Sequence, residues 1–177
     1  MNPSLISSIK SRDQLSITMV CLGNICRSPM AAAVLSNRTA DWIKPKIIVD
    51  SSGTSAFHIG QGAHPTSQKT WEKAGYIYTH SARSFKSNDF FEADLILVMD
   101  SNNFRNVIKL APDEQSRNKV FYLRSFDPEL SSIDPASARF TELEVPDPYN
   151  QSAEAYEETL FMIEHAVDGL LQELSHQ

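Results

Sequence analysis

Strand-sized apolar runs alternate with stretches of helical spacing along nearly all of this 177-residue chain. The runs span residues 16–20, 46–49, 94–99 and 119–123, and their aliphatic and β-branched residues favour buried strands. Amphipathic segments lie between and after them. Because such alternation is typical of parallel strands joined by helical crossovers, the sequence predicts a three-layer α/β fold with a central four-stranded parallel sheet.

The helical segments carry recognisable start and stop signals. Ser28 and Pro29 are expected to open the first helix as its N-cap and its first helical residue. Pro65 is expected at the first position of the second helix, and Gly75 lies just past its end. The third helix has the apolar face Phe104, Val107, Ile108 and Ala111, and Pro112 stops it. The final helix carries the longest apolar stripe: Tyr156, Leu160, Ile163, Val167, Leu170, Leu171 and Leu174.

The charge balance limits the partners of the chain. There are 16 Lys and Arg against 22 Asp and Glu, a formal net charge of −6, which argues against a nucleic-acid coat or a basic membrane-surface protein. Hydrophobic residues make up 41%, an ordinary value for a globular protein. No apolar run approaches the roughly 20 residues that span a bilayer. We therefore expect no nucleic-acid partner, no membrane partner and a monomer.

The start of the chain and its cysteines indicate a single domain in the cytoplasm. Residues 1–14 look like a loose polar lead-in and lack the apolar block of a secretory signal. Residues 15–177 are expected to form one domain, because a chain of this length favours one. Two cysteines cannot build a disulfide framework, so a reducing compartment is expected.

The most informative segment joins the first predicted strand to the first helix. It begins at Cys21 and ends at Arg27, beyond the carboxyl end of a parallel strand, where ligands of such folds bind. Backbone N–H groups of a strand-to-helix loop and the positive end of the helix dipole form an anion cradle. Gly23 permits close approach, and Arg27 can donate two hydrogen bonds to a phosphate. The predicted phosphate-binding residues are Leu22, Gly23, Asn24, Ile25, Cys26, Arg27 and Ser28.

Cys21 lies at the floor of this cradle and is a candidate nucleophile. The positive field favours the thiolate, which is the reactive form of the side chain. A thiolate below a bound phosphate ester can attack phosphorus and form a phosphocysteine, which water then hydrolyses, and Ser28 could donate to the leaving sulfur. The alternative is a buried core residue, the commoner role for a cysteine that ends an apolar strand. Cys21 and Arg27 alone would favour that alternative, but catalysis is favoured by the ordered set between a strand and a helix: Gly23, Asn24, Arg27, Ser28 and Pro29.

Residues 20–29, Val-Cys-Leu-Gly-Asn-Ile-Cys-Arg-Ser-Pro, resemble the signature of the low-molecular-weight protein tyrosine phosphatases. The segments 50–54, 80–83, 99–100 and 147–149 also resemble segments of that family, in the same order. The resemblance covers nearly the whole chain from Ile17 to the final helix. It implies a flavodoxin-like fold of the low-molecular-weight phosphatase type. It also implies hydrolysis of phosphotyrosine proteins or small aryl phosphates without a cofactor.

The resemblance assigns the catalytic roles. It makes Cys21 the nucleophile, Arg27 the group that binds the phosphoryl oxygens, and Asp147 the general acid and then the general base. The chemistry requires such an acid, because a phenolate leaves poorly until it is protonated. Without the resemblance Asp147 could not be chosen among the other aspartates, since Asp-Pro is usually only a turn signal.

The resemblance also assigns residues around the loop. Asn24, which adopts positive φ more readily than most residues, would be held through Ser51 and His80. At Phe57 the family usually has Trp or Tyr, so the aromatic face is kept and the polar edge is lost. The five histidines show no metal-ligand spacing with each other or with the cysteines, and we expect no metal. The pocket walls would be Leu22, Ile25, Phe57 and Tyr149.

Cys26 is a second thiol in the same loop and suggests redox sensitivity. Under peroxide, Cys21 could form a sulfenic acid and then a disulfide with Cys26. The alternative is that Cys26 only packs under the loop.

Two departures from the family pattern bear on the rim of the site. The family usually continues after Tyr149 with an aromatic residue and Gly, whereas this chain has Asn150 and Gln151. The segment 127–145 is longer than usual. It either lengthens the rim beside Asp147 or forms a solvated loop.

Several other functions share this fold. Protein arginine phosphatases resemble the chain closely but carry Thr where it has Ile25, which favours phosphotyrosine. A thiol-dependent arsenate reductase needs further resolving cysteines, and Cys21 and Cys26 are the only two present. A phosphate-binding module without catalysis would normally lack the nucleophile, the arginine or the acid. An unrelated flavodoxin-like domain is the last alternative and predicts no phosphatase activity.

Overall fold

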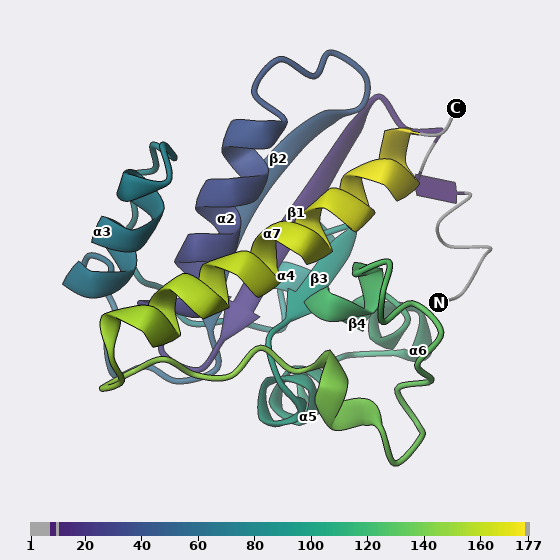
Figure 1. Ribbon diagram of the computed structural model, residues 1–177. Helices are drawn as coiled ribbons and strands as arrows, with labels where there is room; N and C mark the ends of the chain where they lie inside the picture. The colour runs from purple at the N-terminus through teal and green to yellow at the C-terminus, as the bar shows by residue number, and fades with distance from the viewer. Residues whose placement is uncertain (1–7, 10, 176–177) are drawn as a thin grey trace.

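Figure 1 shows the computed structural model, which describes residues 8–9 and 11–175. Within these residues four parallel strands form one sheet in the order β2-β1-β3-β4. The predicted α/β fold with a four-stranded parallel sheet is therefore confirmed. Part of the expected 1–14 lead-in, residues 1–7 and 10, lies outside the described residues. The strands are β1 (Gln14–Cys21), β2 (Lys46–Gly53), β3 (Leu95–Val98) and β4 (Val120–Tyr122).

Helices cover both faces of the sheet. The long helix α7 (Ala153–Ser175) and α2 (Arg27–Arg38) lie side by side over one face, in front of the sheet in Figure 1, and α3 (Pro65–Lys73) packs beside them. The remaining elements are α4 (Asp89–Glu92), α5 (Ser101–Lys109), α6 (Glu114–Arg117) and two 3-10 turns, η1 (Leu123–Phe126) and η2 (Phe140–Leu143). Pro65 opens α3 as predicted, and Gly75 follows its end with φ of +91°.

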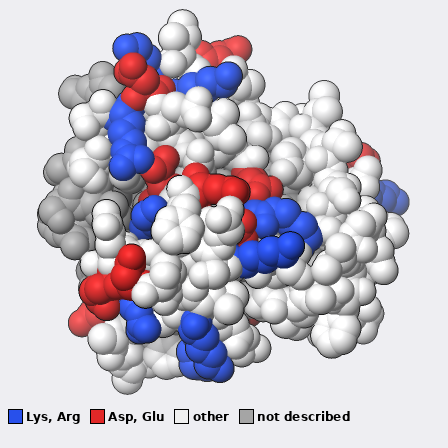
Figure 2. All heavy atoms as spheres, turned by 180° about the vertical axis from the view of Figure 1, so that it is seen from behind, with Lys and Arg blue, Asp and Glu red and all other residues white. Residues whose placement is uncertain are grey.

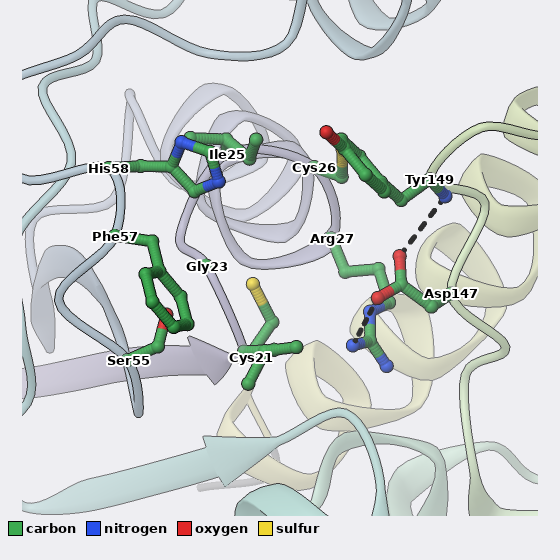
Figure 3. Close-up of a pocket in the computed structure, with 11 residues that line it drawn as sticks. Cys21, Gly23, Ile25, Cys26, Arg27, Ser55, Phe57, His58, Asp147 and Tyr149 are labelled. Atoms are coloured by element: carbon green, nitrogen blue, oxygen red, sulfur yellow. Dashed lines mark hydrogen bonds and ion pairs between the residues drawn. The ribbon is translucent and has the colours of Figure 1, made fainter.

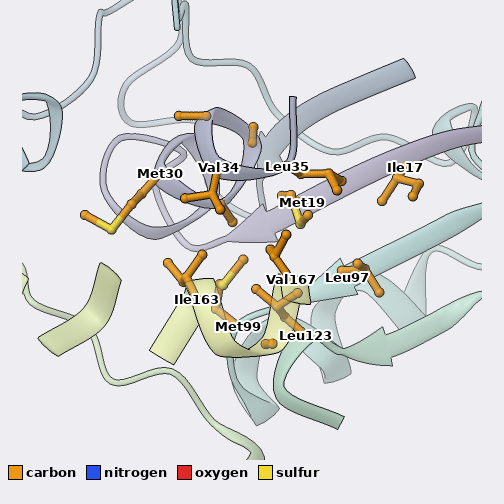
Figure 4. Packing of buried hydrophobic residues seen from close by; sticks show 14 of the residues in the cluster. Ile17, Met19, Met30, Val34, Leu35, Leu97, Met99, Leu123, Ile163 and Val167 are labelled. Atoms are coloured by element: carbon orange, nitrogen blue, oxygen red, sulfur yellow. The ribbon is translucent and has the colours of Figure 1, made fainter. Parts of the chain in front are cut away.

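The core is split by the alternation of side chains along the central strands. Ile17 and Met19 of β1 and Leu97 of β3 pack against α2 and α7, as Figure 4 shows. Val20 and Ile96 point the opposite way and join a second cluster with Phe90 and Val107. Because successive residues of a strand face opposite sides, a continuous apolar run can supply both layers of core. This explains why residues 95–98, which form β3, are apolar on both faces of the strand.

Charged side chains on the opposite face of the molecule are mixed in sign. Figure 2, seen from behind, shows acidic and basic groups next to one another over this face. Among the described residues, Arg83 pairs with Asp50 and with Asp89, and Arg12 pairs with Asp94. These ion pairs neutralise some of the acidic side chains locally.

The first helix does not begin where the sequence predicts. Ser28 is not its N-cap, because α2 begins at Arg27 with Cys26 at the cap position and no side-chain cap. Ser28 is fully buried, and its hydroxyl lies 3.0 Å from Cys21 Sγ and accepts a hydrogen bond from Asn24 Nδ2 at 2.8 Å. The hydroxyl is thus used inside the loop, and the first N–H groups of α2 have no side-chain acceptor.

The segment 127–145, after β4, is exposed over most of its length but is anchored by a few buried residues. It follows the 3-10 turn η1 and includes η2. Ile133 and Leu143 are buried in the second core cluster. Val145 donates its backbone N–H to Met99 O at 2.7 Å, which fastens the end of the segment beside β3. These contacts fix the position of Val145, which lies two residues before Asp147.

A glycine in the middle of α7 marks a close backbone contact. Gly169 faces η1, and a Cβ at this position would lie 1.8 Å from the carbonyl oxygen of Phe126. Glycine normally destabilises a helix interior by about 1 kcal/mol relative to alanine. Its presence in α7 is explained by the need for η1 to approach the helix axis.

We therefore expect Gly169→Ala to destabilise the protein despite the higher helix propensity of alanine. The clash should cost at least about 2 kcal/mol, and lower the melting temperature by roughly 4–8 °C. Gly62→Ala is the matched control, because a Cβ there meets nothing within 4 Å. Thermal unfolding followed by circular dichroism measures both, and a Gly169→Ala variant as stable as the wild type would contradict this account of the contact.

Candidate active site

A cavity of about 220 Å³ opens at the carboxyl end of β1. Figure 3 shows Cys21 at its base, Phe57 and His58 on one side, and Asp147 and Tyr149 on the other. The carboxyl ends of β1, β2 and β3 lie at the same edge of the sheet, so the loops that follow them converge here. The lining residues are Cys21, Leu22, Gly23, Ile25, Cys26, Arg27, Ser55, Phe57, His58, Asp147 and Tyr149.

Asn24 holds the loop in its turned conformation. Its φ is 55°, in the left-handed region, and its side chain is fully buried. The amide nitrogen donates to Ser28 Oγ at 2.8 Å and to Ser51 Oγ at 2.9 Å, and the amide oxygen accepts from the Arg83 backbone N–H at 2.9 Å. His80 Nε2 lies 2.6 Å from the Asn24 carbonyl oxygen. Every polar atom of the side chain is thus bonded, which compensates the unfavourable backbone geometry.

His80 supports the loop as a neutral donor. Burial lowers the pKa of its imidazole, although the hydrogen bond to the Asn24 carbonyl opposes the shift. Because a carbonyl oxygen can only accept, the proton of the neutral ring is on Nε2. Tyr78 stacks on the ring with 6.3 Å between centroids and helps to orient it.

Two glycines allow the loop to pack tightly. A Cβ at Gly53, the last residue of β2, would lie 2.7 Å from the Leu22 carbonyl oxygen and 3.0 Å from the Asn24 nitrogen. A Cβ at Gly23 would lie 3.0 Å from His58 Cδ2. The first glycine lets β2 support the loop from below, and the second lets the wall that carries His58 close over it.

The Cys21 thiol is enclosed by donors. It is 3% exposed, and its sulfur lies 3.0 Å from Ser28 Oγ and accepts the Asn24 backbone N–H at 3.3 Å. The N-terminus of α2, which no side chain caps, lies directly after the loop. Donated hydrogen bonds and a helix N-terminus both favour a negatively charged sulfur.

Arg27 lies between two carboxylates. Its Nη1 donates to Asp100 Oδ2 at 2.6 Å and to the Val145 carbonyl at 3.0 Å, and its Nη2 donates to Asp147 Oδ2 at 3.0 Å. Burial on its own would lower the pKa of the guanidinium, but the negative charges of Cys21, Asp147 and Asp100 raise it above its ordinary value. The group therefore remains a cation although the residue is only 2% exposed.

One edge of the guanidinium remains available. Arg27 Nε is buried and has no hydrogen-bond partner among the described residues. The Oγ of Ser55, another residue that lines the pocket, is in the same condition. A buried N–H of a charged group is costly to leave unpaired, so this edge indicates a missing anionic ligand.

Asp147 stands at the mouth of the pocket, with its side chain 41% exposed. One carboxylate oxygen accepts from Arg27, and the other accepts the Tyr149 backbone N–H at 3.1 Å; Figure 3 draws both bonds. Pro146 and Pro148 flank it and restrict the backbone on both sides. The acid is held in place by the turn and by the arginine together.

Nearly all residues expected at the site meet in this pocket or behind it. The walls Leu22, Ile25, Phe57 and Tyr149 line it, and Phe57 is 83% exposed at its lip. Ser51 and His80 lie behind the loop, against Asn24. Sequence reasoning missed the contacts of Asp100, Arg83, Val145, Ser55 and His58. Asp100 and Arg83 had a signal, since both belong to segments, 99–100 and 80–83, that resemble segments of the family.

Neither a metal site nor a membrane helix is found in the part of the chain that the structure describes. No three His, Cys, Asp or Glu side chains within residues 8–9 and 11–175 are grouped so that they could hold a metal ion. Across the same residues, no helix is both long and apolar enough to cross a bilayer.

Phosphate esters suit this pocket, because a concave array of donors needs an anion and the thiol lies beneath the position of that anion. The fold and the pocket together are those expected of a phosphatase. Comparison with known proteins gives the same class. Residues 16–177 match the family model described as low molecular weight phosphotyrosine protein phosphatase. The chain belongs to this family, and the resemblance seen in the sequence is confirmed: it is a protein-tyrosine phosphatase of the low molecular weight class.

Individual relatives are similar over almost the full chain. A low molecular weight protein-tyrosine-phosphatase of Streptomyces coelicolor is 39% identical over 162 residues, which cover 91% of this chain and 94% of that protein. The crystal structure of a protein tyrosine phosphatase from Entamoeba histolytica has a TM-score of 0.78 at 32% identity, covering 90% and 96% of the two chains. A low molecular weight phosphotyrosine phosphatase from Vibrio cholerae also has a TM-score of 0.78, at 28% identity, covering 92% and 98%.

Proposed function

We propose that this protein hydrolyses phosphotyrosine in proteins, and small aryl phosphates, through a phosphocysteine intermediate. The observation that carries the proposal is that Arg27, whose buried Nε has no partner among the described residues, lines the same pocket as the thiol of Cys21. A phosphoryl group accepts hydrogen bonds from this guanidinium edge and from the loop N–H groups, and places its phosphorus next to the sulfur.

Phosphate binding changes the contacts of Asp147. In the free protein Arg27 Nη2 donates to the Asp147 carboxylate at 3.0 Å. A dianionic phosphoryl group competes for the same cation, while Asp100 and the Val145 carbonyl keep Nη1 in place. Asp147 is then free to face the ester oxygen of the substrate, and the anion beside it favours its protonated form.

The reaction follows in two steps. The Cys21 thiolate attacks phosphorus, the S–P bond forms as the P–O bond to the aryl group breaks, and Asp147 gives its proton to the departing phenolate oxygen. Asp147 then takes a proton from water, the hydroxyl adds to phosphorus and the S–P bond breaks. Ser28 Oγ, 3.0 Å from the sulfur, donates to the thiolate as it leaves. Phosphate departs and the thiolate is restored.

The walls of the pocket favour an aryl group over a smaller one. Ile25, Phe57 and Tyr149 give it apolar sides above a polar floor. Ile25 also supplies a bulky apolar side chain where the related protein arginine phosphatases have Thr. The same anion cradle accepts arsenate as a phosphate mimic, without the distant resolving thiols that a reductase needs.

We also propose that residues 15–177 act as a single phosphatase domain and as a monomer. Both hydrophobic clusters pack on the two faces of one sheet, as expected of a single domain.

Hydrolysis of p-nitrophenyl phosphate in the presence of EDTA tests the proposed chemistry. We expect activity in the wild type and a loss of at least about 10³-fold in Cys21→Ser, because the hydroxyl is a far weaker nucleophile at the same place. The control is phosphate binding by Cys21→Ser, which should persist because Arg27 and the loop are unchanged. Turnover by Cys21→Ser near the wild-type rate would refute the nucleophile assignment, and an inactive wild type would refute the proposed function.

The role of Asp147 predicts a dependence on the leaving group. Asp147→Asn should slow the hydrolysis of phenyl phosphate by roughly 10²-fold or more, and should affect aryl phosphates with acidic phenols much less. The reason is that a stable phenolate leaves without a proton. A series of substituted phenyl phosphates measures the effect, and equal losses across the series would exclude the general-acid role.

Redox sensitivity is a separate proposal that concerns the two thiols of the loop. Peroxide would oxidise the Cys21 thiolate to a sulfenic acid: the sulfur attacks one peroxide oxygen, the O–O bond breaks and hydroxide is released. The Cys26 thiolate would then attack that sulfur, form the disulfide and expel hydroxide, which leaves as water. Thiol reductants would return both side chains to thiols.

Burial raises the pKa of Cys26 to about 12, so this second step should be slow near neutral pH. Below that value each added pH unit increases the thiolate fraction by about tenfold. We expect disulfide formation after peroxide treatment to accelerate from pH 7 to pH 9, as measured by mass spectrometry of the linked peptide. Cys26→Ser is the control, and inactivated wild type without a Cys21–Cys26 peptide would contradict the proposal.

A further inference from the structure

The N-cap of α3 is an unusual choice of residue. His64 occupies this position, and its Nδ1 accepts the Thr66 backbone N–H at 3.2 Å. Asn, Asp, Ser and Thr are the side chains that normally perform this task, because they are short and lose little freedom. An imidazole satisfies the same donor but adds a ring, which indicates that the ring has another use.

The ring of His64 lies against a wall of the pocket. It meets the ring of Tyr149 edge-on, with 5.7 Å between centroids and an interplanar angle of 79°. On another side it stacks on Tyr156, with 5.5 Å between centroids and an angle of 19°. Both are favourable aromatic geometries. Tyr149 therefore has a fixed aromatic neighbour, although its own side chain stands partly exposed beside the pocket in Figure 3.

His64 is itself anchored from three directions. Its backbone N–H donates to the Ile25 carbonyl of the phosphate loop at 2.8 Å. Its Nδ1 accepts from Thr66 and lies 3.3 Å from the Tyr156 hydroxyl, which can donate to it. Because Nδ1 accepts, the neutral ring carries its proton on Nε2. The phosphate loop thus holds the backbone of His64, and α3 and α7 hold its ring, independently of the contact with Tyr149.

We propose that His64 is a positioning residue, which sets the distance of the Tyr149 wall from the phosphate loop and so determines how tightly an aryl group is held. It does not touch the reacting atoms and acts through Tyr149. The opposite wall, Phe57, is 83% exposed and has no aromatic partner among the described residues, so the wall on the Tyr149 side is the one with an aromatic support. This inference rests on the proposed phosphatase function.

The test measures separately how a variant binds the aryl group and how it binds phosphate. His64→Asn keeps a side chain that caps α3 and removes the ring. We expect KM for p-nitrophenyl phosphate and for a phosphotyrosine peptide to rise roughly 3- to 10-fold, as loss of one aromatic pair implies. The inhibition constant of inorganic phosphate, which reaches only the loop and Arg27, should change less than about twofold.

Two further variants identify the partner. In a Tyr149→Ala background the effect of His64→Asn on KM should disappear, because the residue through which it acts is absent. His165→Asn is the matched control, since His165 packs on Phe161 of α7 with 4.2 Å between centroids and should leave KM unchanged. His64→Asp replaces His64→Asn if circular dichroism shows that the latter is not folded.

Each outcome decides the proposal. A rise in KM that is confined to aryl substrates and absent in the Tyr149→Ala background supports it. A parallel rise in the phosphate inhibition constant, an unchanged KM, or the same rise in both backgrounds overturns it. A wild type without phosphatase activity refutes the proposed function instead, so the two failures are distinguishable.

Discussion

The side chain of Asn24 is the constraint on which the site depends. Its amide joins the loop to the start of α2 through Ser28 and to β2 through Ser51, and it receives the backbone N–H of Arg83. These bonds hold φ at 55°, and with it the concave course of the loop. Because Asn24 adopts this left-handed conformation, the loop curves around a single anion-binding position. The Cys21 sulfur, the N-terminus of α2 and the backbone N–H groups of the loop all face that position.

Arg27 connects that loop to the rest of the molecule. A buried guanidinium requires counter-charges, and leaving such a group unpaired costs about 3–5 kcal/mol. Its partners are Asp100, shortly after β3, and the Val145 carbonyl and the Asp147 carboxylate, both in the loop before α7. Satisfying one cation therefore draws two distant segments, one at Asp100 and one at residues 145–147, to the edge of β1. The long 127–145 segment contributes, because Ile133 and Leu143 pack in the second cluster and the Val145 N–H bonds to Met99 O.

Much of the fold could be predicted because the core obeys simple periods. The continuous apolar run of β3 predicted a strand buried on both faces, and the apolar stripe of α7 predicted a helix buried on one face. Pro65 and Gly75 marked the ends of α3. The error at Ser28 has a physical cause. A serine before a proline satisfies the rule for a helix cap, but its hydroxyl bonds with Asn24 and Cys21 inside the loop, and the helix begins two residues earlier than expected. Four-residue elements such as α4 are too short to show a period.

The sequence by itself determined the order of strands and helices, the anion-binding loop and the identity of its thiol and arginine, because all of these depend on residues within about ten positions of each other. Only the tertiary structure decided that Asp100 and Asp147 share Arg27, and that His64 lies between Tyr149 and Tyr156. Asp100 and Asp147 lie 73 and 120 positions after Arg27 in the sequence, and Tyr156 lies 92 positions after His64. Local sequence patterns do not predict contacts between residues so far apart, because the crossovers and the packing of the core determine which loops meet.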